Sequence, residues 1–494
     1  MNCRARGIYP RALSLLNLRN ATIVPSMQVK KAHFIGIGGV GMSAVAKLLK
    51  DTGAEVTGSD EAVYPPVSTF LESVGIVYKT PYAADNIPAD TELIVIGKNA
   101  KLVPETNPEV AAALLSGKPI MSFPEVLGEL SVGQESVVVA GSYGKSTTTA
   151  LLSHCLLEAG KDPSFFIGAV PYTPFTSAAI GKGNLFVFEG DEYPASNTDP
   201  RSKFLLLRPV HTLITPLAHD HINIFPTIED YIQPFKELVV LLPKEGSLVV
   251  CTEGALSADF LRELPREALT YGLTNGDWQA ANIEWGEQTS FDLVERGHMV
   301  IRLETSQLGE HNIQNIVGAG AFLLSNKLMS PEEFALGVRT FKGIQRRLDK
   351  KSEHTSLPIY EGFGSSHEKL RSAIAAMRQH FPERRLLVVF EPNTITWRSR
   401  AALAQYDTAF LDVAKVYVYN PPHDGKATEL TLEEIVNQVQ ISQIKAVGCA
   451  TAEEVLSGLE KDLDSNDCIL LSSSGAMGGL VESIPKLAEK KFPK

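Results

Sequence analysis

The residues best suited to chemistry lie at positions 137–149, where the chain reads VVVAGSYGKSTTT. An apolar run typical of a strand breaks at two glycines and leads into a segment with helical character. A strand, a glycine turn and a helix N-terminus together present backbone N–H groups to an anion. Lys145 could reach phosphate oxygens, and the hydroxyl of Ser146 could bind Mg²⁺. The pattern predicts nucleotide phosphate binding. The loop is a shortened variant, because Val139 stands where the usual pattern has a glycine. The alternative is a tight turn that only starts a helix.

A second glycine turn lies at residues 36–41, which read GIGGVG after a strand-like segment. Residues 42–52 have helical spacing, and residues 55–60 form a second expected strand that closes on Asp60. In a dinucleotide-binding fold such an acid would hold a ribose hydroxyl. Because glycine turns of this kind are common, the pattern favours a nucleotide or nucleotide-sugar ligand without selecting NAD. A nicotinamide-dependent oxidoreductase is therefore an open alternative for this region.

Carboxylates and histidines follow further expected strands. The apolar segment 185–189 runs into acids at 189–192, and ligands of open α/β sheets collect at the carboxyl ends of strands. Carboxylates at such an edge suit Mg²⁺, although a solvated acidic loop would have the same sequence. His219 and His221 also follow a strand, but no third ligand with zinc spacing comes after them, so a zinc site is not favoured.

Elements that could position these residues alternate along the whole chain. With 494 residues, about three domains of roughly 150 residues each fit. We predict an α/β fold with a Rossmann-like domain at residues 28–133, a central P-loop ATPase-type parallel-sheet domain at 134–347, and a C-terminal Rossmann-like domain at 348–494. Residues 1–27 form an extension that is rich in arginine and contains no acid. It could be a transit peptide, but a translation start placed too early is favoured because Met27 directly precedes a strand.

The composition excludes several classes of partner. The formal net charge of −11 argues against nucleic acid, which would need a basic face. No apolar run reaches the roughly 18–20 residues of a membrane helix, so no membrane partner is expected. Five dispersed cysteines without a C-x-x-C pair indicate a reduced, cytoplasmic protein. We expect a monomer or a weak homodimer.

Several strings, in order along the chain, resemble the Mur ligase family of peptidoglycan synthesis. They are VTGSD at 56–60, DEY at 191–193, RSKF at 201–204, DWQA at 277–280 and GEHN at 309–312. The resemblance covers nearly the whole chain and is greater to the murein peptide ligase branch than to the alanine-adding branch. The former joins the tripeptide L-alanyl-γ-D-glutamyl-meso-diaminopimelate to UDP-N-acetylmuramate during wall recycling.

The resemblance implies an ATP-dependent amide synthesis with Mg²⁺. ATP would phosphorylate the lactyl carboxylate of UDP-N-acetylmuramate, and the amine of a peptide or amino-acid acceptor would attack the acyl phosphate. Residues 28–133 would bind the UDP-sugar, residues 134–347 would bind ATP, and residues 348–494 would bind the acceptor. The glycine turn at 36–41 would then serve UDP, which removes the main argument for a dehydrogenase.

By motif position, the resemblance also assigns site residues. The catalytic residues would be Lys145, Glu189 and His221, and the metal ligands Ser146, Glu189 and His221. The ATP site would comprise Gly141, Ser142, Tyr143, Gly144, Lys145, Ser146, Thr147, Asn312, Asn315, Arg346 and Arg347. The UDP-sugar site would comprise Gly38, Gly39, Val40, Gly41, Ser59 and Asp60.

The chain departs from the family pattern near these residues. Tyr143 replaces a histidine of the ATP loop, and an amide and a carboxylate ahead of His221 are absent. At residues 361–367, EGFGSSH replaces a motif with two histidines and a second acid. These changes concentrate in the part that would receive the amine and close over ATP.

A further departure lies in the acceptor domain. Asn393 stands where a family motif has an arginine that could grip a carboxylate, and Arg398 or Arg400 could take over that task. Two interpretations follow: a ligase with a different acceptor, or a catalytically impaired homologue that binds UDP-sugar and ATP as a sensor or scaffold. An alanine-adding ligase is a third. We favour a ligase, because the residues assigned to phosphate and Mg²⁺ are retained.

Overall fold

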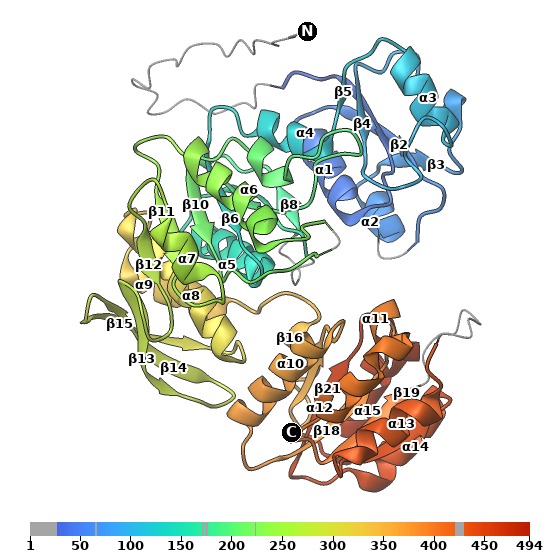
Figure 1. Cartoon of the computed structure of the whole chain (residues 1–494), viewed down its shortest axis with the longest axis vertical. Coiled ribbons are helices and arrows are strands. Elements are labelled where there is room, and N and C mark those ends of the chain that lie inside the picture. The colour runs from blue at the N-terminus through green and yellow to red at the C-terminus, as the bar shows by residue number, and fades with distance from the viewer. Residues whose placement is uncertain (1–26, 65–66, 170–171, 173–175, 223, 420–428) are drawn as a thin grey trace.

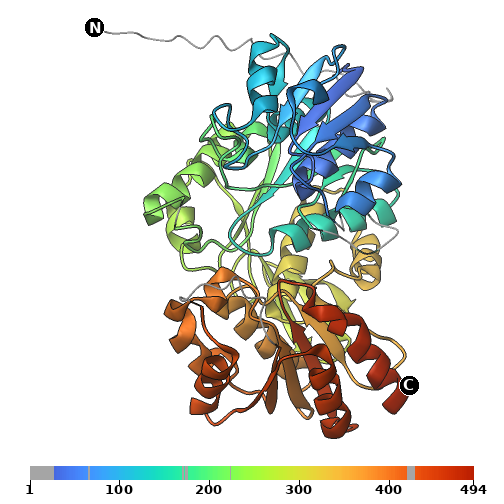
Figure 2. The same cartoon turned by 90° about the vertical axis from the view of Figure 1, so that its right-hand side faces the viewer.

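The computed structural model describes residues 27–494 except 65–66, 170–171, 173–175, 223 and 420–428. Three sheets follow one another along the chain, and Figures 1 and 2 show the first and third at opposite ends of the molecule with the second between them. The predicted three-domain α/β class is confirmed. The predicted N-terminal extension, apart from Met27, lies outside the described residues. No helix in the described part of the chain has the length and apolarity needed to cross a membrane.

The first sheet is parallel, as a Rossmann-like domain requires, with the strand order β3-β2-β1-β4-β5. Its central strand is buried along most of its length, as expected for a parallel strand covered by helices on both faces. Gly36 then turns the chain with a φ of +88°, which a residue without a Cβ adopts freely. The strands are β1 (Lys31–Ile35), β2 (Glu55–Ser59), β3 (Val77–Lys79), β4 (Leu93–Ile96) and β5 (Ile120–Met121). The helices are α1 (Val40–Asp51), α2 (Val67–Ser73), η1 (Ala84–Asn86), α3 (Pro108–Leu115) and α4 (Phe123–Leu130).

The central sheet has ten strands in the order β15-β14-β13-β12-β11-β10-β6-β9-β7-β8. Its middle is parallel, as predicted. The predicted phosphate loop, residues 141–144, follows the end of β6. The strands are β6 (Glu135–Ala140), β7 (Ser164–Phe166), β8 (Ala178–Ala179), β9 (Leu185–Glu189), β10 (His211–Ile214), β11 (Leu248–Cys251), β12 (Leu269–Tyr271), β13 (Trp278–Glu284), β14 (Thr289–Glu295) and β15 (His298–Thr305). The helices are α5 (Lys145–Glu158), η2 (Lys203–Leu206), α6 (Ile228–Leu241), α7 (Ser257–Arg262), α8 (Glu310–Ser325) and α9 (Pro331–Thr340).

An antiparallel extension of this sheet was not predicted. β13, β14 and β15 pair antiparallel, and β8 pairs antiparallel with β7. Strands β14 and β15 are joined by Arg296 and Gly297, whose φ values are +47° and +83°. Two consecutive residues with positive φ make the hairpin turn that matches the twist of paired strands. The Arg-Gly pair between two alternating segments was the available sequence signal.

The third sheet has the order β16-β17-β21-β18-β19-β20 and is parallel except for β16. β16 begins at Arg347, so the last residue of the predicted central domain belongs to this sheet. The strands are β16 (Arg347–Lys350), β17 (Ile359–Gly362), β18 (Arg385–Phe390), β19 (Lys415–Tyr419), β20 (Lys445–Cys449) and β21 (Asp467–Ser472). The helices are α10 (His367–His380), α11 (Ile395–Arg398), η3 (Arg400–Gln405), α12 (Tyr406–Ala409), α13 (Leu432–Ile441), α14 (Ala452–Asp462), η4 (Met477–Gly479) and α15 (Leu480–Lys491).

The buried side chains join the first two sheets. One apolar cluster runs from β1 and α1 through α4 into β6, β9 and α6. The ring of Phe123 on α4 lies 6.3 Å from the ring of Phe166 on β7, centroid to centroid. A second cluster covers the other face of the central sheet. The third sheet has two apolar clusters of its own. One of them also contains Leu308, which comes from the central part of the chain.

Candidate active site between the first two domains

The predicted phosphate loop connects β6 to α5 through two glycines with positive φ. Gly141 and Gly144 have φ values of +134° and +86°, and α5 begins at Lys145. A Cβ on Gly141 would lie 2.2 Å from Thr215 Oγ1, and one on Gly144 would lie 2.4 Å from Asn315 Oδ1. Only glycine fits both positions, so the loop is held tightly against β10 and α8.

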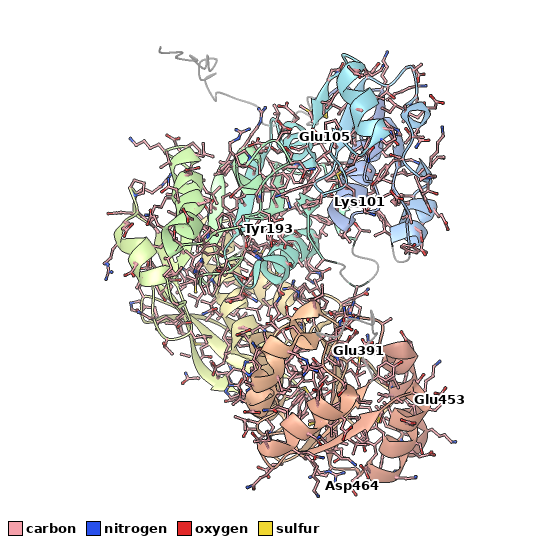
Figure 3. The ribbon with its side chains drawn as sticks, turned by 45° about the vertical axis from the view of Figure 1, so that its right-hand side comes forward. Lys101, Glu105, Tyr193, Glu391, Glu453 and Asp464 are labelled. Atoms are coloured by element: carbon pink, nitrogen blue, oxygen red, sulfur yellow. The ribbon has the colours of Figure 1, made fainter. Side chains whose placement is uncertain are left out.

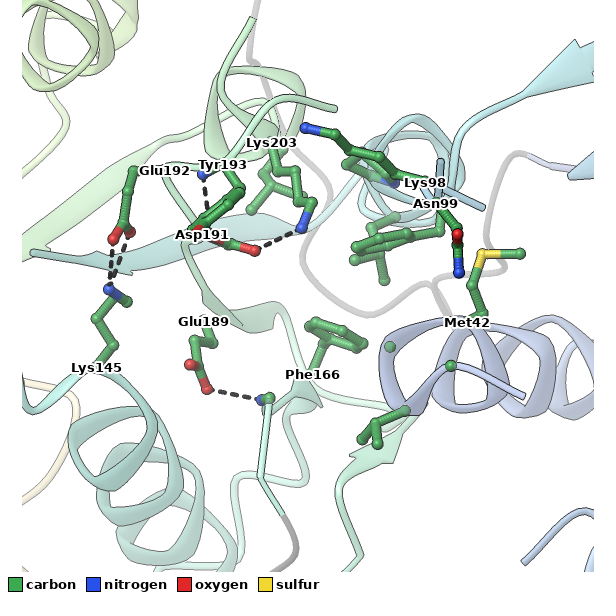
Figure 4. Close-up of a pocket in the computed structure, with 18 of the residues that line it drawn as sticks. Met42, Lys98, Asn99, Lys145, Phe166, Glu189, Asp191, Glu192, Tyr193 and Lys203 are labelled. Carbon is green, nitrogen blue, oxygen red and sulfur yellow. Dashed lines mark hydrogen bonds and ion pairs between the residues drawn. The ribbon is translucent and has the colours of Figure 1, made fainter. Parts of the chain in front are cut away.

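Lys145 is paired with a carboxylate that was not assigned to the site. Its Nζ lies 2.9 and 3.2 Å from the two oxygens of Glu192, and it also donates to Gly141 O at 2.5 Å. Figure 4 shows this pair at one side of the cavity. Glu192 is only 1% exposed, and its Oε1 lies 3.2 Å from His221 Nε2. The hydrogen bond to Glu192 raises the pKa of His221, and the other ring nitrogen lies 3.1 Å from the Tyr193 hydroxyl.

Two of the three predicted metal ligands meet. Ser146 Oγ donates to Glu189 Oε1 at 2.7 Å, and Glu189 Oε2 accepts from Gly168 N at 2.7 Å. His221, the third predicted ligand, does not join them, because its Nε2 lies 3.2 Å from Glu192 Oε1. No group of three or more His, Cys, Asp or Glu side chains in the described ranges is placed to hold a metal ion. A hydroxyl and a carboxylate are nevertheless hard oxygen donors of the kind Mg²⁺ prefers, so Ser146 and Glu189 fit that ion.

The remaining loop residues differ in what their side chains can reach. Ser142 Oγ donates to Ala218 O and lies 2.7 Å from the Tyr231 hydroxyl, so it anchors the loop to the next strand connection. Thr147 is buried in the first turn of α5. Tyr143 is 46% exposed, and burial together with the charges of Asp220 and Glu368 raises its pKa. Since Glu368 lies in the first turn of α10, the loop faces the C-terminal domain.

The two predicted asparagines lie behind the loop on α8. Asn312 donates to Leu308 O at 2.8 Å, and Asn315 donates to Asn312 Oδ1 at 3.3 Å. Both are buried. Their neighbour His311 is exposed to solvent.

The paired arginines separate. Arg347 Nη2 donates to Ser146 Oγ at 3.3 Å, which places its guanidinium at the phosphate loop. Arg346 points the other way: its Nη2 donates to Ser473 O and Gly475 O, and its Nε lies 3.2 Å from Glu361. Of the two arginines, only Arg347 contacts the predicted phosphate loop, whereas Arg346 contacts the C-terminal domain.

The residues predicted to bind the UDP-sugar also differ in what their side chains contact. Gly38 N donates to Asp60 Oδ2 at 2.8 Å, and the Tyr82 hydroxyl donates to Asp60 Oδ1 at 2.9 Å. Asp60 thereby braces the glycine turn. Ser59 is fully buried, and its hydroxyl donates to Glu109 Oε1 at 2.6 Å. The Ser59 side chain faces the interior rather than a ligand.

A cavity of about 710 Å³ links the glycine turn to the phosphate loop. Gly39, Val40 and Gly41 line it, as do Lys145 and Glu189. Figure 4 shows Met42, the next residue of the chain, across the cavity from Lys145. Gly38, Ser59 and Asp60 are not among its lining residues. One continuous space therefore reaches both predicted nucleotide sites.

Two lysines in this cavity were missed by sequence reasoning. Lys203 Nζ lies 2.5 Å from Asp191 Oδ2 and 5.2 Å from the centroid of the Phe123 ring. Lys98 Nζ lies 5.8 Å from the Tyr193 ring centroid, and burial followed by the charge of Lys203 lowers its pKa. Figure 4 shows both lysines on the side of the cavity away from Lys145. Lys98 lies two residues after the end of β4, so its place near the carboxyl end of a strand was the available signal.

Comparisons with known proteins agree with this arrangement. The family model of the Mur ligase middle domain matches residues 139–323, and that of the Mur ligase family, catalytic domain, matches residues 31–134. The UDP-N-acetylmuramate--L-alanine ligase of Endomicrobium trichonymphae is 31% identical over 435 residues, covering 86% of this chain and 93% of that protein. The chain belongs to the Mur ligase family. The oxidoreductase alternative for residues 28–133 is not supported, because the family model that matches there is that of a ligase.

Solved structures are similar to this Mur ligase over most of its length. The UDP-N-acetylmuramate-alanine ligase of Thermotoga maritima has a TM-score of 0.73 at 21% identity, covering 93% of this chain and 99% of that one. The UDP-N-acetylmuramate:L-alanyl-gamma-D-glutamyl-meso-diaminopimelate ligase of Neisseria meningitides has a TM-score of 0.59 at 31% identity, covering 64% and 100%. The chain is thus an ATP-dependent amide-forming ligase of the Mur type, with relatives on both predicted branches.

The loop at residues 361–367 of the C-terminal domain, which departs from the family pattern, is well anchored. Glu361 is buried between Arg346 and Lys351, whose Nζ lies 2.9 Å from Glu361 Oε2. The hypothesis that Arg398 or Arg400 replaces the missing arginine is not supported. Arg398 is buried in an ion pair with Glu429 at 3.1 Å, and Arg400 pairs with Glu434 at 2.9 Å.

Proposed function

We propose that this Mur ligase uses ATP and Mg²⁺ to join an amino acid or a peptide to UDP-N-acetylmuramate. The observation that carries the proposal is the single cavity that reaches from Gly39–Gly41 in the first domain to Lys145 in the second. A UDP-sugar held at the glycine turn can extend its carboxylate along this space toward the terminal phosphate of ATP.

The reaction has two balanced steps. A carboxylate oxygen of the lactyl group attacks the γ-phosphorus of ATP, the bond to the β-phosphate oxygen breaks, and ADP leaves. The acceptor amine then attacks the carbonyl carbon of the acyl phosphate, loses a proton, and inorganic phosphate departs as the amide forms. Lys145 and Arg347 supply positive charge where negative charge builds on the transferred group.

The chain's own residues divide the remaining tasks. Ser146 and Glu189 would hold Mg²⁺, which neutralises phosphate charge when bound, and His221 would stay paired with Glu192. Asn312 and Asn315 would border the adenine side. Lys98 and Lys203 add positive charge on the UDP-sugar side of the cavity, where the pyrophosphate and the carboxylate carry negative charge.

The acceptor is the least constrained substrate. The murein peptide ligase branch is supported by the strings at 191–193 and 201–204 and by the Neisseria enzyme at 31% identity. The L-alanine-adding branch is supported by relatives such as the enzymes of Endomicrobium trichonymphae and Clostridium tetani, the latter 28% identical over 457 residues. Both branches share the acyl-phosphate chemistry.

A phosphate-release assay tests the proposal. Purified protein with Mg²⁺, ATP and UDP-N-acetylmuramate should release phosphate only when an acceptor is added, and mass spectrometry should detect the amide. The acceptor panel contains L-alanine, other amino acids and peptides that contain D-glutamate. Binding of both nucleotides without turnover across this panel would instead support an impaired homologue acting as a sensor or scaffold.

A further inference from the structure

The first turn of α10 carries a lysine that the proposed function leaves without a task. The side chain of Lys369 is exposed, and its Nζ donates to Ser365 Oγ at 3.2 Å. No carboxylate in the described part of the chain forms an ion pair with it. Lys145, by contrast, is paired with Glu192 at 2.9 Å. Among the described residues, the ammonium of Lys369 thus has a hydroxyl as its partner and no carboxylate.

The start of α10 lies at the junction with the central domain. The loop before it leaves the carboxyl end of β17, which lies beside those of β21 and β18. Figure 3 shows Glu391, the residue after β18, at the end of the C-terminal domain nearest the other two domains. Arg347 on β16 is in register with Gly362, the last residue of β17, and donates to Ser146 Oγ at 3.3 Å. The end of β17 therefore faces the phosphate loop.

The charges around Lys369 come from both sides of this junction. Partial loss of water around the ammonium, followed by the positive charge of Arg347, lowers the pKa of Lys369, and Lys145 adds to this effect. The carboxylates of Asp220 and Glu368 act in the opposite direction without reversing it. Like charges that share one region repel each other. An anion bound among these three cations would relieve that repulsion.

The sequence of the loop agrees with a charge-bearing role for Lys369. Ser365 and Ser366 stand where the family pattern has two histidines, whose rings can carry a positive charge. A serine carries none. The buried Trp397 donates its Nε1–H to Gly364 O at 2.8 Å and holds the loop in place. The ammonium on Ser365 thus restores a positive charge to a loop that has lost two histidines.

We propose that Lys369 binds the terminal phosphate of ATP at the domain junction. Lys145 would contact this phosphate from the central domain, and Arg347 and Lys369 would contact it from the elements of the third sheet. During transfer, charge spreads over the three equatorial oxygens of the phosphoryl group, which suits three separate cations. This inference rests on the proposed function and adds a residue of the C-terminal domain to the ATP site.

Two nucleotides that differ by the terminal phosphate test this assignment. Calorimetry would compare β,γ-methylene-ATP, which is not cleaved, with ADP, each in the presence of Mg²⁺ and UDP-N-acetylmuramate. Lys369→Met should weaken binding of β,γ-methylene-ATP about 10- to 100-fold, as expected for a lost charge-assisted hydrogen bond, and leave ADP within about twofold. Lys369→Arg keeps the charge and should retain most of the affinity.

A matched control lies elsewhere in the same domain. Lys461 is an exposed lysine on α14, close in the chain to Asp464, which Figure 3 shows at the end of the domain far from the junction. Lys461→Met should change the affinity for neither nucleotide. Methionine and arginine favour helices about as well as lysine does, so all three variants should fold.

Each outcome decides the assignment. A loss confined to β,γ-methylene-ATP in Lys369→Met, and largely prevented in Lys369→Arg, would support it. An unchanged ratio of the two affinities in Lys369→Met would overturn it, as would equal losses in Lys369→Met and Lys369→Arg. Because this assay needs no turnover, it also separates the two proposals. A loss confined to β,γ-methylene-ATP in a protein that turns over no acceptor would retain the phosphate contact while the ligase proposal fails.

Discussion

Replacing Glu109 by glutamine tests how the first domain holds its ligand turn. The Glu109 side chain is fully buried, and four groups point at its two oxygens. His33 Nε2 lies 2.8 Å and Ser59 Oγ 2.6 Å from Oε1, while Asn86 Nδ2 lies 2.9 Å and Ala83 N 3.0 Å from Oε2. A glutamine offers one oxygen and one NH₂ group. Depending on how the amide turns, either Ala83 N and Asn86 Nδ2 lose their acceptor, or Ser59 and His33 must accept a hydrogen bond instead of donating one.

The cost follows from this geometry. Leaving a buried hydrogen-bonding group without its partner costs about 1–3 kcal/mol, and more when the lost partner carried a charge. Because two groups are affected at once, we expect a total cost of about 3–5 kcal/mol. The Ser59 hydroxyl is one of the groups whose hydrogen bond changes. The Ser59 carbonyl in turn accepts from Gly36 N and Ile37 N at 2.9 and 3.0 Å. We therefore expect Glu109→Gln to loosen the glycine turn and to weaken UDP-sugar binding about tenfold, an effect of about 1.4 kcal/mol.

The same carboxylate gives a pH signature. Burial alone raises the pKa of Glu109, but hydrogen bonds from His33, Ser59 and Asn86 outweigh it and hold the pKa below its usual value. A lowered folded pKa means that the carboxylate stabilises the fold fully above about pH 4.3, the ordinary pKa of glutamate. This contribution is lost as the pH falls through the folded pKa. The gap between wild type and variant should therefore close in acid.

Hydrogen exchange of β1 and β2 measures the effect in the right domain. At pH 7 the variant's amides should exchange about 10²- to 10³-fold faster, since about 1.4 kcal/mol corresponds to a factor of ten. Glu72→Gln, an exposed site on α2, should change the opening free energy by less than about 0.5 kcal/mol. A loss below about 1 kcal/mol in Glu109→Gln, or one that stays constant down to pH 3, would refute the reasoning.

Three further predictions concern the site and the junction of the first two domains. Lys145→Ala should abolish ATP binding, measured by calorimetry, while UDP-sugar binding persists; equal loss of both ligands would contradict the separate sites. His221→Asn should destabilise the protein most below about pH 6.5, because the raised pKa of His221 adds stability that disappears as the pH rises through that pKa. A stability difference that is constant from pH 6 to 9 in denaturant titrations would argue against this. Gly128→Ala should cost about 1–3 kcal/mol in the same titrations, because its Cβ would lie 2.1 Å from the backbone oxygen of Leu206; an unchanged midpoint would show that α4 can shift.

Local patterns predicted the strand, turn and helix that form the candidate phosphate loop. The strand, the glycine turn and the first turn of α5 are set by neighbouring residues, so Gly144, Lys145 and Ser146 could be placed from sequence. Glu189 followed because it ends a strand beside β6. The antiparallel strands β13–β15 were not predicted, although the two-residue turn at 296–297 is a local signal of a hairpin.

Choices between neighbours could not be predicted. Arg346 and Arg347 are adjacent and chemically equal, and only the junction geometry sends one to Ser473 and the other to Ser146. Ser59 and Asp60 likewise divide, because a strand alternates its faces and Ser59 meets a buried acid 50 residues away. Glu192 contacts both Lys145 and His221, and these three residues come from three separate segments of the chain. Contacts of this kind depend on tertiary structure, which a single sequence does not reveal.

The apolar cluster shared by the first two sheets has a consequence for how the molecule unfolds. Because one core runs from β1 through α4 into β6, neither domain can lose its packing without exposing that of the other. The C-terminal sheet has its own clusters and joins the rest through Arg346 and Leu348, both with positive φ. We expect two cooperative units during denaturation. A destabilising change in the acceptor domain would then leave the nucleotide sites folded, so this domain can vary in sequence at little risk to the other two.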